Sequence, residues 1–296
     1  ADHGLTSLRR FFMIKIQFTI TTSTIQKNNH HRMELLMSDQ CFAANAPGNY
    51  KNAILIQGAM DCEICDLLFH MEDVQKTELM QFPFYMGRLC GQKVIVSKTF
   101  QGMVNAGAAT VLAISHFMPR CIINQGVCGG HDPALHRGDM ILGETIFNNS
   151  NLRFSDSPDE NPLHGCIQIG CESLRVEDAG KKCTFYHSDK MLLTTAQKLS
   201  ATHQISALSG ISIKTGTIAS CDAWLNRLDY IHFMHTTFHS CGEDMETAAV
   251  AQLCHSYDIP LLSLRSLSNT LVHQEDYDES AAANCQHFVC ALLPLL

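Results

Sequence analysis

Carboxylates stand next to two apolar stretches of the sequence, after the first and at the start of the second, and carboxylates are common acids and bases in enzymes that cleave bonds. Glu63 stands in GAMDCE, which follows the apolar run NAILIQ, and Glu246 stands in GEDMETAAVAQLC beside Met245. Helix capping or the helix dipole can account for Glu63, or for one or two of Glu243, Asp244 and Glu246. Capping does not require Glu246 inside an apolar run. Glu63 and Glu246 are therefore candidates for chemistry, with capping as the alternative.

Three further segments carry residues suited to binding a planar ligand. TGTIASCDAW contains Trp224, the only Trp of the chain, which can stack on a base or belong to a core. SLRSLSN ends with Ser268 and Asn269, and NQGVCGG contains Gly126, whose lack of a side chain permits close backbone approach. NQGVCGG is not a GxGxxG dinucleotide motif, and a structural turn is its alternative.

Two short motifs raise the question of metal or redox chemistry. His131, Asp132 and His136 lie close together in GGHDPALH, but no further ligand is identifiable. Cys62 and Cys65 form a CxxC without the second pair that a zinc site needs. The chain has 14 cysteines, and its length and apolar content indicate reduced, buried thiols rather than a disulfide framework. We expect no metal and no other cofactor.

The elements that must position these residues alternate between strands and helices. Apolar runs predict buried strands at 52–57, 82–87, 93–98, 121–124, 211–218 and 261–266, and helical spacing predicts helices at 103–117, 189–202 and 245–257. This alternation implies an α/β fold with a mostly parallel sheet covered on both faces. Ligands then bind beyond the carboxyl ends of the strands. The turn-rich segment 148–182 is expected to be a surface excursion that shapes the rim of the site.

Composition limits the classes of partner. The chain has 296 residues, of which 46% are hydrophobic and 17% charged, as in ordinary globular proteins. A formal net charge of −8 argues against nucleic acid, which needs clustered Lys and Arg. No run of about 18 or more apolar residues occurs, so no membrane span is predicted. A small molecule is the expected partner.

The first 50 residues differ from the rest. Residues 1–50 are polar, rich in Asn and His and aperiodic, and we expect a poorly ordered N-terminal extension, with one folded domain over 51–296. Arg9 and Arg10 precede an apolar stretch that resembles a signal peptide, but Lys15 interrupts it. We expect a cytoplasmic protein, with a secreted or periplasmic one as the alternative.

The ordered set GAMxxE, INxGxxGG, GxIASxDxW, DMETAAVAQLC and LRSLSN resembles the purine and uridine phosphorylase superfamily. The similarity is closest to its methylthioadenosine/S-adenosylhomocysteine nucleosidases, and it runs from about Asn52 to the C-terminus. The resemblance implies a single three-layer α/β/α sandwich around a twisted, barrel-like mixed sheet. It further implies that this catalytic domain is generally dimeric and acts on a purine nucleoside.

The resemblance also implies roles for individual residues. Glu63 would be the general base for the water that attacks the anomeric carbon, and Glu246 would accept hydrogen bonds from the ribose hydroxyls. Asn269 stands where these nucleosidases have an Asp that protonates purine N7, and an amide cannot deliver that proton. The remaining implied substrate contacts lie near the ribose, near the base or in the glycine segment: Ala59, Met60, Thr99, Gly126, Trp224, Leu225 and Met245.

Two other functions stay open within the same fold. A phosphorylase would hold phosphate with Arg, and neither GAMDCEIC nor INQGVCGG contains one, although Lys98 or Arg137 could substitute. A nucleoside-binding or storage protein that has lost activity is compatible with Asn269. The missing Arg favours hydrolysis over phosphorolysis, and the presence of Glu63 and Glu246 counts against a storage protein.

Overall fold

The computed structural model describes residues 50–155, 165–202 and 205–296, all within one compact unit, Ala46–Leu296. The predicted N-terminal extension lies outside the described residues except for Tyr50, which is buried. In the part of the chain that the structure describes, no helix is both long and apolar enough to cross a membrane.

Ten strands form one mixed sheet, in the order β11–β6–β12–β13–β5–β1–β4–β3–β2, and β14 pairs with β5 and β6. Parallel pairs join β1 to β4 and β5, β12 to β6 and β13, and β14 to β5. The strands are β1 (Ile54–Gly58), β2 (Glu72–Leu79), β3 (Phe82–Leu89), β4 (Gln92–Lys98), β5 (Cys121–Gly130), β6 (Met140–Asn148), β11 (Tyr186–His187), β12 (Ile213–Ser220), β13 (Ser240–Asp244) and β14 (Leu261–Asn269). The structure confirms the predicted mixed α/β fold.

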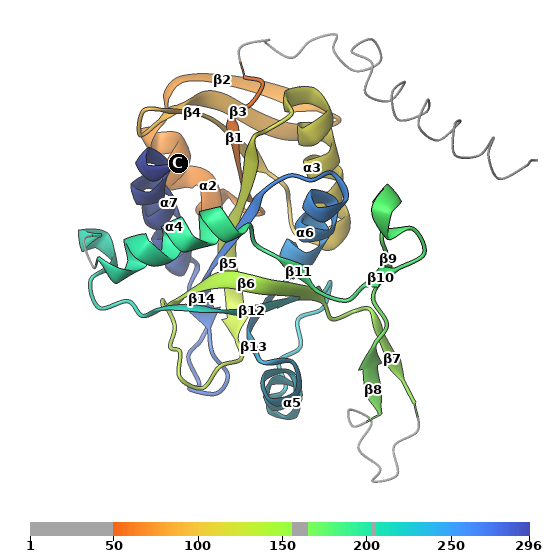
Figure 1. Cartoon of the computed structure of the whole chain (residues 1–296). Helices are drawn as coiled ribbons and strands as arrows, with labels where there is room; N and C mark the ends of the chain where they lie inside the picture. Colours follow the sequence, from red (N-terminus) through yellow and green to blue (C-terminus); the bar gives the residue numbers. More distant parts are fainter. Residues whose placement is uncertain (1–49, 156–164, 203–204) are drawn as a thin grey trace, which may run out of the picture. The chain divides into compact units, whose positions relative to one another are not determined.

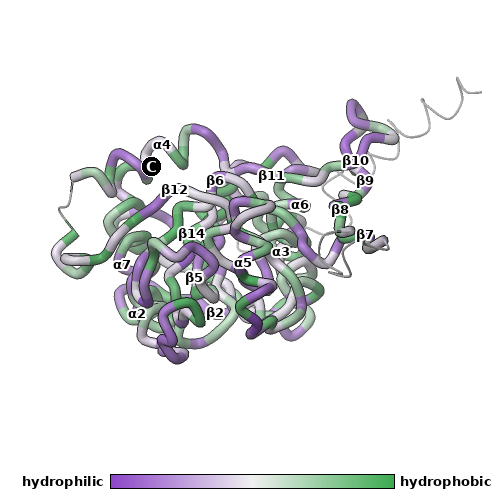
Figure 2. Tube along the Cα trace, turned by 90° about the horizontal axis from the view of Figure 1, so that it is seen from below, coloured by the Kyte–Doolittle hydropathy of each residue, from purple (hydrophilic) through white to green (hydrophobic). Residues whose placement is uncertain are grey.

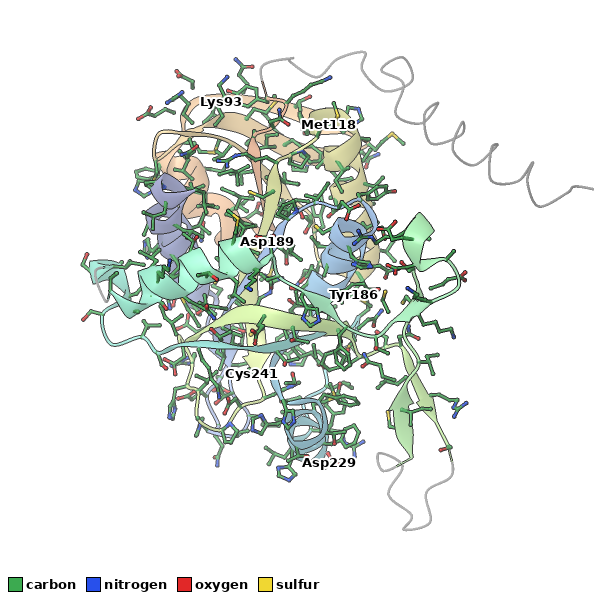
Figure 3. The ribbon with its side chains drawn as sticks, viewed as in Figure 1. Lys93, Met118, Tyr186, Asp189, Asp229 and Cys241 are labelled. Atoms are coloured by element: carbon green, nitrogen blue, oxygen red, sulfur yellow. The ribbon has the colours of Figure 1, made fainter. Side chains whose placement is uncertain are left out.

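Strand β14 closes half of this sheet into a ring. Strands β6, β12, β13 and β5 pair in succession, and β14 connects β5 back to β6. Each ring strand contributes a buried side chain to one interior cluster, which contains Cys128, Ile141, Ile218, Cys241 and Leu267. Cys241 is labelled in Figure 3. Closure leaves the ring strands without free edges, and it accounts for the barrel-like sheet that the resemblance implies.

Helices cover both faces of the sheet (Figure 1). Helices α2 (Asp61–His70), α4 (Lys190–Ala201) and α7 (Ala282–Leu292) pack on the face that buries Ile54 and Ile56. Helices α3 (Met103–Phe117) and α6 (Thr247–Ser256) pack on the opposite face, which buries Leu55. Alternate residues of β1 thus enter different layers, as the period of a strand requires. Helix α5 (Leu228–Phe238) packs beside the ring at β13.

Local sequence explains where helix α4 begins. Asp189 caps α4 by accepting hydrogen bonds from the backbone N–H groups of Met191 and Leu192, and Figure 3 labels it at that helix start. The helices carry hydrophilic and hydrophobic residues together, as Figure 2 shows along the tube, because each buries one face and exposes the other.

The segment expected to be a surface excursion forms small structures of its own. Strands β7 (Leu152–Phe154) and β8 (Cys166–Gln168) pair with each other, and so do β9 (Cys171–Glu172) and β10 (Lys182–Cys183). Figure 1 shows β7 and β8 extending away from the ring. None of these four strands contributes a residue to the large cavity described below.

Three predicted elements differ from the structure in their bounds. The glycine segment NQGVCGG belongs to β5 and is not a turn, because β13 and β14 pair with it on both sides. The helix predicted to start at Met245 starts at Thr247, since Glu246 occupies the cap position with a non-helical backbone. The strand predicted at 211–218 is present two residues later, as β12.

The ring is tightly packed at Gly143 in β6, which gives a test of the fold. A Cβ on Gly143 would lie 2.6 Å from Cδ1 of Ile218 and 3.0 Å from Cβ of Ser263. Gly143→Ala should lower the free energy of unfolding by about 1–3 kcal/mol through overpacking, as measured by urea denaturation. The control is Gly107→Ala in α3, where the nearest atom, Cδ1 of Leu253, is 3.8 Å away. That change should stabilise by roughly 0.5–1 kcal/mol. Equal stability of Gly143→Ala and the parent would contradict this packing.

Candidate active site

The largest group of predicted site residues lies around one cavity. The cavity encloses about 810 Å³, counting its open mouth, and is lined by residues at or just after the carboxyl ends of β1, β4, β5, β12, β13 and β14. These segments are far apart in the sequence, and the ring brings them together. The position agrees with the general rule that ligands bind at this edge of α/β sheets.

Most of the predicted site residues line this cavity, and two do not. Thr99 is buried, with its hydroxyl 3.2 Å from the carbonyl oxygen of Phe100, and Gly126 lies against the carboxyl group of Glu63. Their proposed substrate contacts stay predictions. The residues that line the cavity as the resemblance implies are Ala59, Met60, Glu63, Trp224, Leu225, Met245, Glu246 and Asn269.

The backbone fixes the carboxyl group of Glu63. Its Oε2 accepts hydrogen bonds from the N–H groups of Ala59 at 2.5 Å and Met60 at 3.0 Å, and its Oε1 accepts one from Val127 at 2.8 Å. Gly126 provides the space for this carboxyl, because a Cβ there would lie 2.3 Å from Oε1. Glu63 is thus held in one orientation by β5 and by the start of its own helix.

Burial makes two carboxyl groups of the cavity stronger bases than ordinary carboxylates. Burial raises the pKa of Glu63 above its usual range, against the opposing effects of Arg265 and the three N–H donors. Burial and the neighbouring charges of Asp244 and Glu63 raise the pKa of Glu246 to about 8. The N–H of Gly102 donates to Oε1 of Glu246 at 2.9 Å and so helps to fix that side chain.

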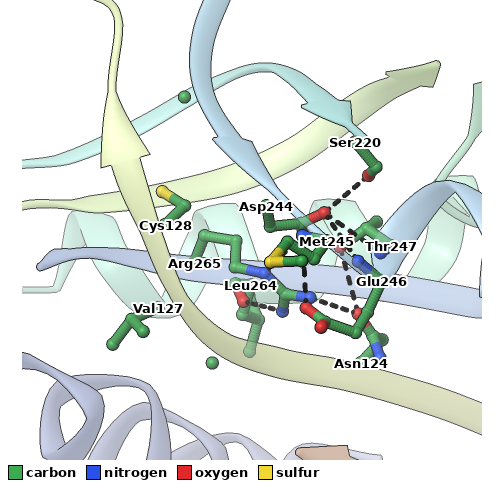
Figure 4. A network of polar contacts seen from close by, with 12 residues as sticks. Asn124, Val127, Cys128, Ser220, Asp244, Met245, Glu246, Thr247, Leu264 and Arg265 are labelled. Carbon is green, nitrogen blue, oxygen red and sulfur yellow. Dashed lines mark hydrogen bonds and ion pairs between the residues drawn. The ribbon is translucent and has the colours of Figure 1, made fainter. Parts of the chain in front are cut away.

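A buried guanidinium opposes these negative charges (Figure 4). Arg265 donates from Nε to Oδ2 of Asp244 at 2.6 Å, from one terminal nitrogen to Oδ1 of Asn124 at 2.6 Å, and from the other to the carbonyl of Leu264 at 2.9 Å. The hydroxyl of Ser220 donates to Oδ1 of Asp244. Sequence reasoning missed Arg265 because it lies within an apolar strand. The signal was available, since a buried Arg almost always needs a partner of opposite charge.

Aromatic side chains form the mouth of the cavity. Trp224 is 64% exposed, so it is not a core Trp, and its ring centroid lies 5.9 Å from that of Tyr277. Leu225 and Leu271 line the cavity beside them. Sequence reasoning did not select Tyr277, which follows β14 by several residues in an irregular segment. Together these side chains provide an apolar surface on which a planar ring can stack.

The residues of the metal hypothesis have separate partners. His131 is buried, and burial lowers its pKa to about 3. Asp132 accepts a hydrogen bond from Lys214, and His136 contacts Glu275. Among residues 50–155, 165–202 and 205–296, no group of three or more His, Cys, Asp or Glu side chains is placed to hold a metal ion.

The candidate phosphate ligands also lie elsewhere. Nζ of Lys98 is 2.7 Å from a carboxylate oxygen of Asp61, and Arg137 donates to the carbonyl of Asp276. Each of the three guanidinium nitrogens of Arg265 donates to a protein oxygen. The described residues that line the cavity include no Lys or Arg. The cavity therefore lacks the cations that usually hold phosphate.

Comparison with known proteins agrees with this architecture. The sequence pattern of the family described as the Phosphorylase superfamily matches residues 53–294, and the chain belongs to that superfamily. Similar members are 5′-methylthioadenosine/S-adenosylhomocysteine nucleosidases. The one from Shewanella sediminis is 30% identical over 244 residues, which cover 81% of this chain and 97% of the relative. The one from Geobacillus kaustophilus is 28% identical over 247 residues, which cover 81% and 96%.

Solved structures share the fold. The crystal structure of the Neisseria meningitidis 5′-methylthioadenosine/S-adenosylhomocysteine nucleosidase in complex with methylthio-immucillin-A has a TM-score of 0.67 and 24% identity, covering 83% of this chain and 100% of that chain. The native structure of futalosine hydrolase of Helicobacter pylori has a TM-score of 0.66 and 23% identity, covering 82% and 97%. The similarity to nucleosidases in sequence and fold confirms the resemblance.

The buried ion pair at the centre of the site generates a stability prediction. Arg265→Met would leave the buried carboxylate of Asp244 without its charge partner, which should cost about 3–5 kcal/mol in the free energy of unfolding. Guanidinium chloride denaturation measures this loss. The control is Arg137→Met at an exposed position, which should change stability by about 0.5 kcal/mol or less. Similar effects of the two substitutions would show that Arg265 does not balance the buried charge.

Proposed function

We propose that the protein is a purine nucleosidase that hydrolyses the N-glycosidic bond of 5′-methylthioadenosine, S-adenosylhomocysteine or a related purine nucleoside. The carboxyl group of Glu63 carries the proposal, since three backbone N–H groups fix it in an open cavity with an aromatic mouth. The nucleosidases similar to this chain match over nearly their whole length, which supports the same reaction class. We place the activity in residues 51–296.

The proposed mechanism uses only groups of the protein and water. Glu63 takes a proton from the water that attacks the anomeric carbon, and its raised pKa favours this transfer. Glu246 accepts hydrogen bonds from the ribose hydroxyls, and Met245 lies beside the sugar. The negative charge of Glu63 stabilises the positive charge that develops on the sugar as the bond to the base breaks.

The other predicted contacts complete the substrate site. Ala59 and Met60 flank the ribose, and their N–H groups are already used to hold Glu63. Trp224 and Leu225 stack on the base, and the amide of Asn269 forms hydrogen bonds with its edge. No cofactor takes part in this mechanism.

We also propose a cytoplasmic homodimer. All cysteines of the described residues are free thiols, which suits a reducing compartment. Helix α3 exposes Val104 and Val111, which are two turns apart on one face and suit burial against a second copy of the chain.

Replacing the general base tests the mechanism. Glu63→Gln should retain binding of adenine but lower kcat by about 10²- to 10⁴-fold, because an amide cannot accept the proton of water. Steady-state release of free base and calorimetric binding of adenine measure the two effects. Glu72→Gln, at an exposed position of β2, serves as the control. Loss of kcat within about threefold would remove Glu63 from the role of base.

The absence of Lys and Arg among the lining residues leads to a prediction about the acceptor. Base release should proceed in phosphate-free buffer and yield free ribose or a 5-substituted ribose, and added phosphate should not produce a sugar 1-phosphate. Chromatography of the products with and without phosphate distinguishes the two reactions. Strict dependence on phosphate would support a phosphorylase, and no release from any nucleoside would support a binding protein.

A further inference from the structure

The proposed reaction needs a proton for the departing purine, and Asn269 cannot supply it. An amide donates hydrogen bonds but carries no proton that is acidic at neutral pH. Glu63 serves the water in the proposed mechanism. A second acidic group at the base end of the cavity is therefore required if the leaving base is to be protonated.

The strand register places such a group opposite Asn269. Gly129 of β5 pairs with Glu243 of β13 on one side and with Asn269 of β14 on the other. A Cβ on Gly129 would lie 3.7 Å from Nδ2 of Asn269, so the Asn269 side chain leans over the open face of this glycine. Glu243 and Asn269 both line the cavity. Because neighbouring strands are about 4.8 Å apart, the two residues flank a gap of about 10 Å with no side chain in its middle.

This gap lies at a different end of the cavity from Glu63. The Glu63 carboxyl is bound to the N–H of Val127, two residues before Gly129 in β5. Two residues of an extended strand correspond to about 7 Å. Glu63, with the carboxyl group of Glu246 as its neighbour, therefore defines a sugar end, and Glu243 with Asn269 defines a base end.

The contacts of Glu243 determine where its proton resides. The hydroxyl of Tyr230 donates to Oε2 of Glu243 at 2.8 Å, and Nδ2 of Asn149 donates to the same oxygen. An oxygen that accepts two hydrogen bonds favours negative charge. The proton of the neutral carboxyl therefore belongs on Oε1, the other oxygen of a side chain that lines the cavity.

Burial keeps this proton available near neutral pH. Burial raises the pKa of Glu243 to about 7, the charge of Asp244 acts in the same direction, and hydrogen bonds from Tyr230, Asn149 and Cys221 act against it. His131 and Tyr277 also line the cavity, and both are unsuited to the task. Burial lowers the pKa of His131 to about 3, so this side chain is uncharged at neutral pH and has no acidic proton to give. Burial raises the pKa of Tyr277, which makes its hydroxyl a weaker acid.

We infer that Glu243 is the acid that protonates the departing purine, and that Glu243 and Asn269 hold the base from opposite sides of Gly129. This inference rests on the proposed nucleosidase activity. The bond between the anomeric carbon and the base breaks with its electron pair on the base, and the proton of Glu243 Oε1 moves to a ring nitrogen. The water oxygen bonds to the anomeric carbon while Glu63 takes its proton. Glu243 ends ionised and Glu63 protonated, and exchange of one proton with solvent restores both.

Two substrates with different leaving groups test this role. Glu243→Gln keeps the shape and the hydrogen-bonding side chain but removes the proton. For 5′-methylthioadenosine its kcat should fall by about 10²- to 10⁴-fold with little change in KM. For 4-nitrophenyl β-ribofuranoside, whose leaving group needs no protonation, its kcat should stay within about threefold of the parent. A merely structural role would lower both rates equally.

A rescue variant supplies a second readout on the nucleoside alone. Adding Asn269→Asp to Glu243→Gln restores an acid on the opposite side of the base and should recover at least about tenfold in kcat. Glu243→Gln within about threefold of the parent, equal losses on both substrates, or no recovery in the double variant would overturn the inference while leaving the nucleosidase proposal intact. A parent enzyme that releases base from no nucleoside would overturn the nucleosidase proposal and this inference together.

Discussion

The buried guanidinium of Arg265 is the charge on which the site depends. Asp244, Glu63 and Glu246 all raise the pKa of Arg265, so one fixed cation faces three acidic groups. Burying such groups without a cation would cost several kcal/mol for each charge. Arg265 lies on β14, the strand that closes the ring, and Asp244 ends β13. Ring closure and charge compensation are therefore provided by the same strand.

The protein separates its carboxyl groups by environment and not by residue type. Glu63 is held by backbone N–H donors and interacts with the charge of Arg265. Glu243 is held by Tyr230 and Asn149, and it lies opposite Gly129, two residues beyond the β5 residue that binds Glu63. Different neighbours around chemically similar groups are a general way to obtain an acid and a base at one pH. The two proposed roles require opposite protonation states, and the length of the cavity keeps them apart.

The glycines of β5 provide the space for this arrangement. Gly126 leaves room for the Glu63 carboxyl, and Gly129 leaves the gap between Glu243 and Asn269. Glycine weakens a strand because it adds conformational entropy and no packing. Pairing of β5 with β13 and β14 offsets that cost at these positions.

The sequence by itself determined the fold class, the family and most of the cavity, because carboxylates, glycines and Trp224 directly follow apolar runs whose ends meet at one edge of the sheet. An apolar run and the residues next to it form one short stretch of the chain, so both can be recognised in the sequence alone. Only the tertiary structure decided that NQGVCGG is a strand, that Arg265 faces Asp244, and that Glu243 lies across Gly129 from Asn269. These depend on the register between strands that are distant in the sequence, and the pattern within a single segment carries no information about which residue of another strand lies opposite.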